Sequence, residues 1–150
     1  MTAINRALRL MLPAALLAGT GLVLSCVGAS AGQTVTVTLK DKGMESMTIE
    51  TSPAEIKAGE VVFNVTNTSE TLVHEFVVAK SDTPVEALPY DEAEKEVSED
   101  AMEVQSEIED IDPGKSGTLT LDLTPGTYLL LCNKVGHFKA GMVKMIKVVQ

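Results

Sequence analysis

Three side chains near the C-terminus of the 150-residue chain can bind a soft metal ion. Cys132, His137 and Met142 lie in the stretch LLLCNKVGHFKAGM, with four residues in each gap. Thiolate and thioether are soft ligands and imidazole is intermediate, so this set suits copper far better than magnesium or calcium. Zinc sites normally take a further thiolate or a carboxylate. The spacing therefore indicates a copper site on one short loop.

A trigonal copper site with a weak axial methionine uses two histidines and one cysteine, so the loop needs a second histidine from elsewhere. The chain has one other histidine, His74, in the stretch TLVHEFVVAK at the start of a predicted strand. Taken alone, a histidine in a strand is usually a hydrogen-bonded polar side chain, and a methionine in an apolar stretch is usually core. The combination of a remote histidine with a Cys-x4-His-x4-Met loop favours copper.

The N-terminus has the pattern of a secretory signal peptide. Arg6 and Arg9 precede an apolar run at residues 10–24, and Ala29-Ser30-Ala31 has the small-x-small pattern of a cleavage site. We therefore expect residues 1–31 to be removed from an exported, periplasmic protein whose single domain spans residues 32–150.

The two cysteines of the chain cannot form a disulfide within the expected mature domain. Cys26 lies in the leader, and an alternative cut in LVLSC would make it the lipidated N-terminus of an anchored lipoprotein. Cys132 is the other cysteine and remains unpaired in either case. An unpaired thiol in an oxidising compartment calls for an explanation such as a bound metal or catalysis.

The elements that must position these ligands are predicted to be β-strands. In TVTVTLK, residues 34–40, valine and leucine alternate with threonine, as in a strand with one buried face. Pro113-Gly114 and Pro125-Gly126 mark chain reversals. Further short segments of this kind predict an all-β sandwich, and they are MTIET, VVFNVTN, HEFVVAK, GTLTLDL, TYLLLC and MVKMIKVV.

One segment interrupts the β pattern and carries most of the charge. Loss of residues 1–31 removes two arginines and no acid, which changes the formal charge from −9 to −11. Residues 82–112 hold thirteen acids and one base, Lys95. Apolar residues from Tyr90 to Val104 recur at three- and four-residue steps, which predicts an amphipathic helix of about 14 residues. The segment is either a solvated insertion or a docking surface.

The sequence resembles the cupredoxin family of small blue copper proteins. The resemblance covers residues 34–149 and is carried by EIKAGEVVFNVTN, HEFVV, DPGKSGTLTLDLTPGTYLLLCNKVGHFKAGM and the last predicted strand. The equal gaps in the loop are most similar to those of auracyanin and rusticyanin. The resemblance implies a Greek-key sandwich of about eight strands, here with a short acidic helical insertion, and one type 1 copper ion. It also implies that His74, Cys132, His137 and Met142 are the ligands.

The resemblance further implies electron transfer without catalysis. We expect a monomer that exchanges one electron with a c-type cytochrome or an oxidase or reductase, binds no nucleic acid, and contacts a membrane only if Cys26 is lipidated. His137 is expected near the surface, with Val135 and Phe138 forming an apolar contact around it. The alternative function is a periplasmic protein for copper tolerance or delivery. Such proteins often have methionine-rich or histidine-rich segments, and MESM is the only hint of one here.

One residue departs from the family pattern. Many members have an asparagine directly after the first histidine, where it ties the two ligand loops together, but this chain has Glu75. Strand alternation points Glu75 away from the side of the ligand, and a buried acceptor needs a donor. We predict that its carboxylate accepts a backbone N–H of the copper loop near Asn133 or Lys134.

Overall fold

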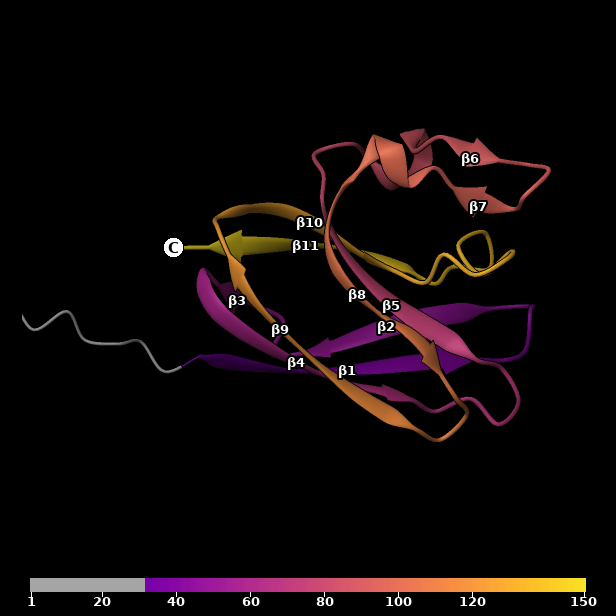
Figure 1. Ribbon diagram of the computed structural model, residues 1–150, viewed down its shortest axis with the longest axis horizontal. Helices are drawn as coiled ribbons and strands as arrows, with labels where there is room; N and C mark the ends of the chain where they lie inside the picture. Colours follow the sequence, from indigo (N-terminus) through magenta and orange to yellow (C-terminus); the bar gives the residue numbers. More distant parts are fainter. Residues whose placement is uncertain (1–31) are drawn as a thin grey trace, which may run out of the picture.

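The computed structural model describes residues 32–150 (Figure 1). The predicted signal peptide at 1–31 and the alternative lipidation site Cys26 lie outside the described residues. Within residues 32–150, no helix has the length and apolar character needed to cross a membrane.

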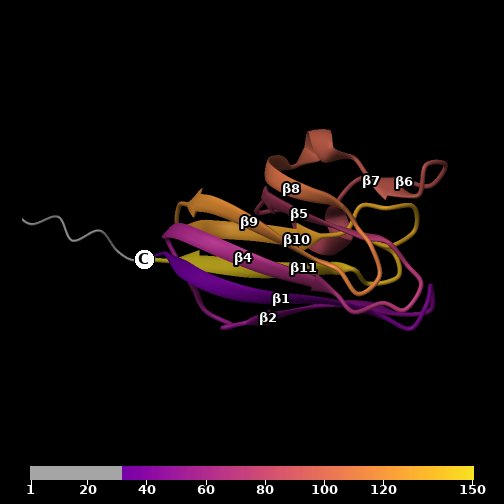
Figure 2. The ribbon, with the colours of Figure 1, turned by 60° about the horizontal axis from the view of Figure 1, so that its bottom comes forward.

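Two β-sheets pack face to face, as Figures 1 and 2 show. The first sheet has the order β2-β1-β4-β9, with bounds Met47–Ser52, Gln33–Asp41, Gly59–Asn67 and Ser116–Leu123. The second sheet has the order β3-β11-β10-β5-β8, with bounds Ile56–Lys57, Val143–Val149, Gly126–Leu131, His74–Lys80 and Glu103–Ile111. Eight of these strands in residues 32–150 have six or more residues, which confirms the predicted sandwich of about eight strands.

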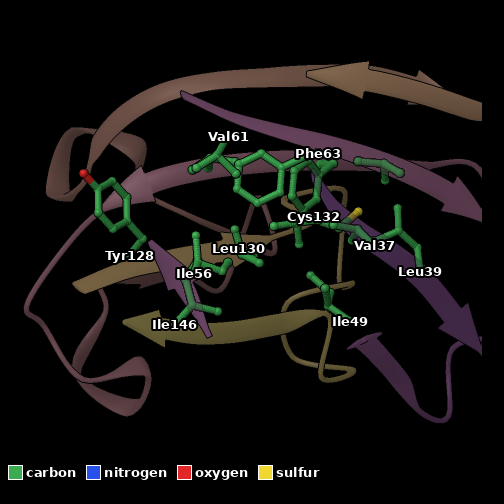
Figure 3. Packing of buried hydrophobic residues seen from close by; sticks show 14 of the residues in the cluster. Val37, Leu39, Ile49, Ile56, Val61, Phe63, Tyr128, Leu130, Cys132 and Ile146 are labelled. Atoms are coloured by element: carbon green, nitrogen blue, oxygen red, sulfur yellow. The ribbon is translucent and has the colours of Figure 1, made fainter. Parts of the chain in front are cut away.

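The main core lies between the two sheets and follows from strand alternation. Val35, Val37 and Leu39 of β1 are fully buried, whereas the threonines between them face outward. Phe63 of β4 meets Phe76 of β5 across the sandwich, with ring centroids 5.6 Å apart. Figure 3 shows apolar side chains of this core, among them Val37, Leu39 and Phe63, filling the interior. Because a slip of one residue would expose the apolar set, this pattern fixes the register of the strands that carry the site.

The acidic segment does not form the predicted amphipathic helix. Its helical content in the structure is two single-turn 3-10 helices, η1 at Val85–Ala87 and η2 at Glu99–Ala101. Between them a short hairpin pairs β6, Tyr90–Asp91, with β7, Glu96–Val97. Lys95, with φ of 61°, makes the turn before β7. After η2 the segment continues as the long strand β8, which contains the stretch SEIEDI.

A second apolar core explains why the segment folds back as a hairpin. The strands β5 and β10 are apolar on their outer face as well as on their inner one, so that face must be covered. The acidic segment covers it with Leu88, Val97 and Met102, which pack on outward-facing residues of the sheet. These sheet residues are Val77, Ala79, Leu129 and Leu131. Tertiary burial therefore overrides the helical periodicity, and the segment is an integral cover with an acidic outer surface.

Candidate metal centre

Three of the four predicted ligands converge at one end of the sandwich. His74 is the first residue of β5, Cys132 directly follows β10, and His137 lies in the loop that leads to β11. All three side chains are buried, and their donor atoms form a cluster that could hold a metal ion. Figure 3 shows Cys132 among the buried side chains of the main core, next to Val37. Two distant segments of the chain thus bring three potential metal donors together.

The donor atoms form a compact triangle. His74 Nδ1 lies 3.1 Å from His137 Nδ1 and 3.9 Å from Cys132 Sγ, and His137 Nδ1 lies 3.2 Å from that sulfur. Ligands spread evenly around one ion, with nitrogen at about 2.0 Å and sulfur at about 2.3 Å, would place the two nitrogens about 3.5 Å apart and each nitrogen about 3.7 Å from the sulfur. The three observed distances differ from these separations by about half an ångström or less. The donor set and its geometry therefore fit a trigonal site for copper.

Met142 is buried in the main core, and its backbone is bonded to Cys132 and His137. Its side chain belongs to the same core cluster as Cys132 and is 0% exposed. The Met142 N–H donates to the carbonyl of His137, and the Cys132 N–H donates to the carbonyl of Met142, both at 3.0 Å. These bonds close the loop on itself, so the three residues of the Cys-x4-His-x4-Met pattern are held together by their own backbone.

Neighbouring backbone also clamps the loop from the side of β2. The Met47 N–H donates to the carbonyl of Ala140 at 2.7 Å. The next residue, Gly141, has φ of +103°, and a Cβ there would lie 2.8 Å from the Met47 carbonyl oxygen. Glycine is therefore required at position 141, because both its backbone conformation and this close approach exclude a side chain.

Burial sets the protonation states of the donors in the metal-free protein. It raises the pKa of the Cys132 thiol to about 11, against the effect of the N–H groups of Glu75 and Lys134. Burial, followed by the charges of His74 and Lys134, lowers the pKa of His137 to about 4. At neutral pH the imidazole of His137 is thus ready to bind, whereas Cys132 must lose a proton when a metal enters.

Glu75 makes the predicted tie to the copper loop. Its Oε1 accepts a hydrogen bond from the backbone N–H of Asn133, and its own N–H donates to Cys132 Sγ at 3.3 Å. Burial raises the pKa of the Glu75 carboxyl, while the Asn133 N–H and the charge of Lys134 oppose that rise. The carboxylate thus takes the place in which many cupredoxins have an asparagine.

The acidic segment holds the same loop through its backbone. The Asn133 side chain accepts from the Val97 N–H at 2.8 Å and donates to the Val97 carbonyl at 2.9 Å. The Gly136 N–H donates to the Lys95 carbonyl at 2.8 Å. Asn133 and Gly136 both lie between Cys132 and His137 in the chain, so the segment braces the stretch that carries two of the donors.

The sequence did not reveal the partner of the other His74 nitrogen. Asp41, the last residue of β1, places Oδ2 3.1 Å from His74 Nε2. Burial tends to raise the pKa of Asp41, but hydrogen bonds from Ser69, His74 and the Gly43 N–H outweigh it, so the pKa is lowered. Nothing in the sequence around Asp41 marks it, because only the folded chain brings it to a histidine 33 residues away.

The surface around His137 differs in part from the expectation. His137 is only 6% exposed, and Val135 is 58% exposed as predicted. Phe138 is buried, because its ring stacks on Tyr90 of the acidic segment with centroids 5.9 Å apart. Met44, which is 52% exposed, lies beside Gly136. The exposed apolar residues near His137 are therefore Val135 and Met44, and not Val135 and Phe138.

Comparison with known proteins agrees with this geometry. The chain matches the model of the copper binding proteins of the plastocyanin/azurin family over residues 33–149, and it belongs to that family. No curated protein sequence matches the chain. Family membership, together with the His-Cys-His cluster, supports one copper ion as the cofactor.

The solved structures similar to this chain include auracyanins and rusticyanin. A dithionite-reduced auracyanin from the photosynthetic bacterium Roseiflexus castenholzii has a TM-score of 0.58 and 21% identity, covering 81% of this chain and 100% of the other. Reduced rusticyanin has a TM-score of 0.58 and 23% identity, with 79% and 81% covered. Auracyanin B has a TM-score of 0.57 and 21% identity, with 83% and 94% covered. These similarities establish a cupredoxin-like fold.

Proposed function

We propose that the protein is an exported one-electron carrier and that His74, Cys132, His137 and Met142 hold its copper ion. The observation that carries the proposal is the buried triangle of two imidazole nitrogens and one thiol sulfur in a copper-binding fold. When bound, copper supplies a one-electron couple between Cu(I) and Cu(II). The chain itself supplies no exposed nucleophile at this site, since Cys132 is 0% exposed. We therefore propose a carrier and not an enzyme.

The protein residues would keep the coordination geometry nearly the same in both oxidation states. Cu(I) favours soft, low-coordinate sites and Cu(II) favours tetragonal ones, so a site that cannot relax toward either limits the rearrangement during transfer. The loop from Cys132 to Met142 is bonded to itself, to Met47 and to the acidic segment. His74 is the first residue of β5, a strand that pairs with β10 on one side and β8 on the other. These contacts would hold the donors in similar positions with and without the metal.

The methionine has a separate role in this proposal. Replacing Met142 by leucine keeps a similar apolar volume and removes the thioether. Because a methionine thioether would be the weakest of the four ligands, we expect the copper to stay bound while the visible spectrum and the reduction potential shift. Copper analysis with redox titration of the variant measures both. Complete loss of copper from Met142→Leu would contradict an axial role.

The site of electron exchange is proposed to be the end of the sandwich at His137. Val135 and Met44 form an exposed apolar surface beside this residue, and such a surface suits a brief contact with a redox partner. The acidic segment lies next to it, with Glu92 paired to Lys139 and Glu99 near the Asn133 amide. We propose a partner with a basic docking face, such as a c-type cytochrome or an oxidase or reductase domain.

Charge on the acidic segment is expected to speed the encounter with such a partner. Neutralising Glu94, Asp100 and Glu103, which are exposed, should lower the association rate severalfold at low salt and flatten its dependence on salt. The reason is that exposed charges steer association and are screened over about 8 Å at physiological ionic strength. Stopped-flow electron transfer with a basic cytochrome over a salt series measures both effects.

A matched triple variant provides the control for this experiment. Glu55, Glu60 and Asp122 are exposed acids at the opposite end of the strands, and their neutralisation changes the net charge equally. It should leave the salt slope nearly unchanged. Equal slopes for the two triple variants would show that the acidic segment only covers the sheet and does not dock a partner.

Export is proposed on the leader pattern, with a soluble periplasmic protein or a lipoprotein anchored at Cys26 as its two forms. The mass of the protein isolated from membranes and from the soluble fraction distinguishes them.

The alternative function in copper tolerance or delivery has less support from the structure. Of the two methionines in MESM, Met47 is buried and only Met44 is exposed, so no methionine-rich surface forms there.

A further inference from the structure

Asp41 and His74 form a buried pair that connects the first sheet to the second. Asp41 ends β1 and His74 begins β5, and their side chains are 6% and 0% exposed. The carboxylate oxygen Oδ2 lies 3.1 Å from Nε2 of the imidazole, while Nδ1 of the same ring faces His137 and Cys132. The two nitrogens of His74 therefore have two different partners on opposite sides of the ring.

The carboxylate is itself fixed by other groups. Its Oδ1 accepts from the Gly43 N–H at 2.9 Å, and the nearby Ser69 hydroxyl helps to lower its pKa. Ser69 Oγ accepts from the N–H groups of Thr71 and Leu72, which leaves its own proton free for Asp41. A carboxylate with three donors around it has little freedom to move away from the histidine.

Buried Asn67 holds the segment between β4 and His74. Its Oδ1 accepts from the Ser69 N–H, and its Nδ2 donates to the carbonyls of Leu72 and Ile111, each at 2.8 Å. The chain before His74 is therefore tied to β8 as well as to the end of β1. The segments around Asp41 and His74 are therefore held in place by hydrogen bonds, as is needed if Asp41 is to fix the position of the His74 ring.

We propose that Asp41 is a positioning residue that fixes the tautomer and orientation of His74 and favours Cu(II) over Cu(I). A carboxylate that accepts from Nε2–H leaves the lone pair on Nδ1, which is the nitrogen that faces the other donors. The fixed negative charge next to the ligand also stabilises the more positive metal. This inference rests on the proposed copper site.

Two carboxylates then act on the site from different directions. Asp41 bonds to the ring of His74, and Glu75 bonds to the backbone just after Cys132. Neither residue belongs to the loop from Cys132 to Met142. Because each negative charge favours the oxidised metal, the two carboxylates together should give a reduction potential that is low for sites with these four ligands.

The first test needs no electron-transfer partner. In nitrogen-15 NMR spectra of the full chain, both metal-free and loaded with Cu(I), the His74 ring should carry its proton on Nε2, and this proton should exchange slowly with water. Asp41→Asn keeps an acceptor and should retain this tautomer, whereas Asp41→Ala should give a mixture in the metal-free protein. A wild-type proton on Nδ1 in the metal-free protein would overturn the proposal, even if copper binding itself proved wrong.

The second test measures the effect of the charge. Asp41→Asn should weaken Cu(II) binding about tenfold relative to Cu(I), since outer groups typically affect metal affinity 10- to 100-fold. For one electron a tenfold change corresponds to a rise of about 59 mV in the reduction potential. Glu70→Gln is the control, because Glu70 is exposed near Asp41 and makes no bond to His74. A shift as large in Glu70→Gln, or no shift in Asp41→Asn, would overturn the proposal.

Discussion

Replacing Cys132 by alanine is expected to abolish the intense visible absorption of the copper-loaded protein while the sandwich still folds. The colour of a type 1 site comes from charge transfer between the thiolate and Cu(II), and no other thiol lies in residues 32–150. The core does not depend on the sulfur, because Cys132 is one small side chain in a cluster of nineteen buried residues. Absorption spectra and circular dichroism of the variant measure the two effects.

The other cysteine provides a matched control for this substitution. Cys26→Ala in the full chain also removes one thiol, but from the predicted leader. It should leave the visible spectrum unchanged whether or not that residue is lipidated. A Cys132→Ala protein that folds and keeps the intense band would remove the assignment of Cys132 as the thiolate ligand.

Removal of the Glu75 carboxylate is expected to have the second largest effect. Glu75→Ala deletes the acceptor of the Asn133 N–H, and a charge-assisted bond of this kind contributes about 1.5 to 3 kcal/mol when shielded from water. Since Glu75 is only partly buried, the lower value applies, which corresponds to roughly tenfold faster copper release. Glu75→Gln keeps the shape and an acceptor oxygen, so it should retain copper and raise the reduction potential.

Glu107→Gln separates the hydrogen bond from the general effect of charge. Glu107 is an exposed acid whose charge acts on Glu75, and it has no hydrogen bond to the copper loop. Copper release to a chelator should therefore remain close to the wild-type rate in this variant. If Glu75→Ala releases copper no faster than Glu107→Gln, the Asn133 bond does not hold the loop.

The long strands and the convergence of donors could be predicted from local patterns. Period-two alternation in TVTVTLK and GTLTLDL gives a buried face that the structure contains, with Val37 and Leu123 in the core. The loop spacing was informative for a physical reason. A backbone that bonds Cys132 to Met142 and Met142 to His137 needs a fixed number of residues in each gap. The role of Glu75 followed from its position beside His74 and from the need of a buried acceptor for a donor.

The acidic segment could not be predicted, because its conformation depends on a surface made elsewhere. The steps of three and four residues from Tyr90 through Ala93 to Val97 fit a helix. In the hairpin, however, Tyr90 and Val97 pair across two short strands. The hairpin forms because it lets the segment bury its apolar residues against the apolar outer face of β5 and β10. The sequence of those strands shows that both faces are apolar, but not which segment covers the outer one.

Two further residues were missed or misplaced for similar reasons. Asp41 contacts His74 through the packing of two sheets, and no spacing rule connects residues that far apart. Phe138 was expected at the surface beside His137, but the stacking partner Tyr90 comes from the acidic segment. An error about the fold of that segment thus also produced the error about Phe138.

The most informative single measurement is a titration of the purified protein with Cu(II), followed by visible absorption and electron paramagnetic resonance. The proposed site predicts one copper per chain and an intense visible band that saturates at that ratio and disappears on reduction. The band reports a thiolate bound to Cu(II), which requires that Cys132 lose the proton it holds in the metal-free protein. Stoichiometric copper binding with only the weak absorption of a nitrogen and oxygen site would contradict a type 1 centre at His74, Cys132 and His137.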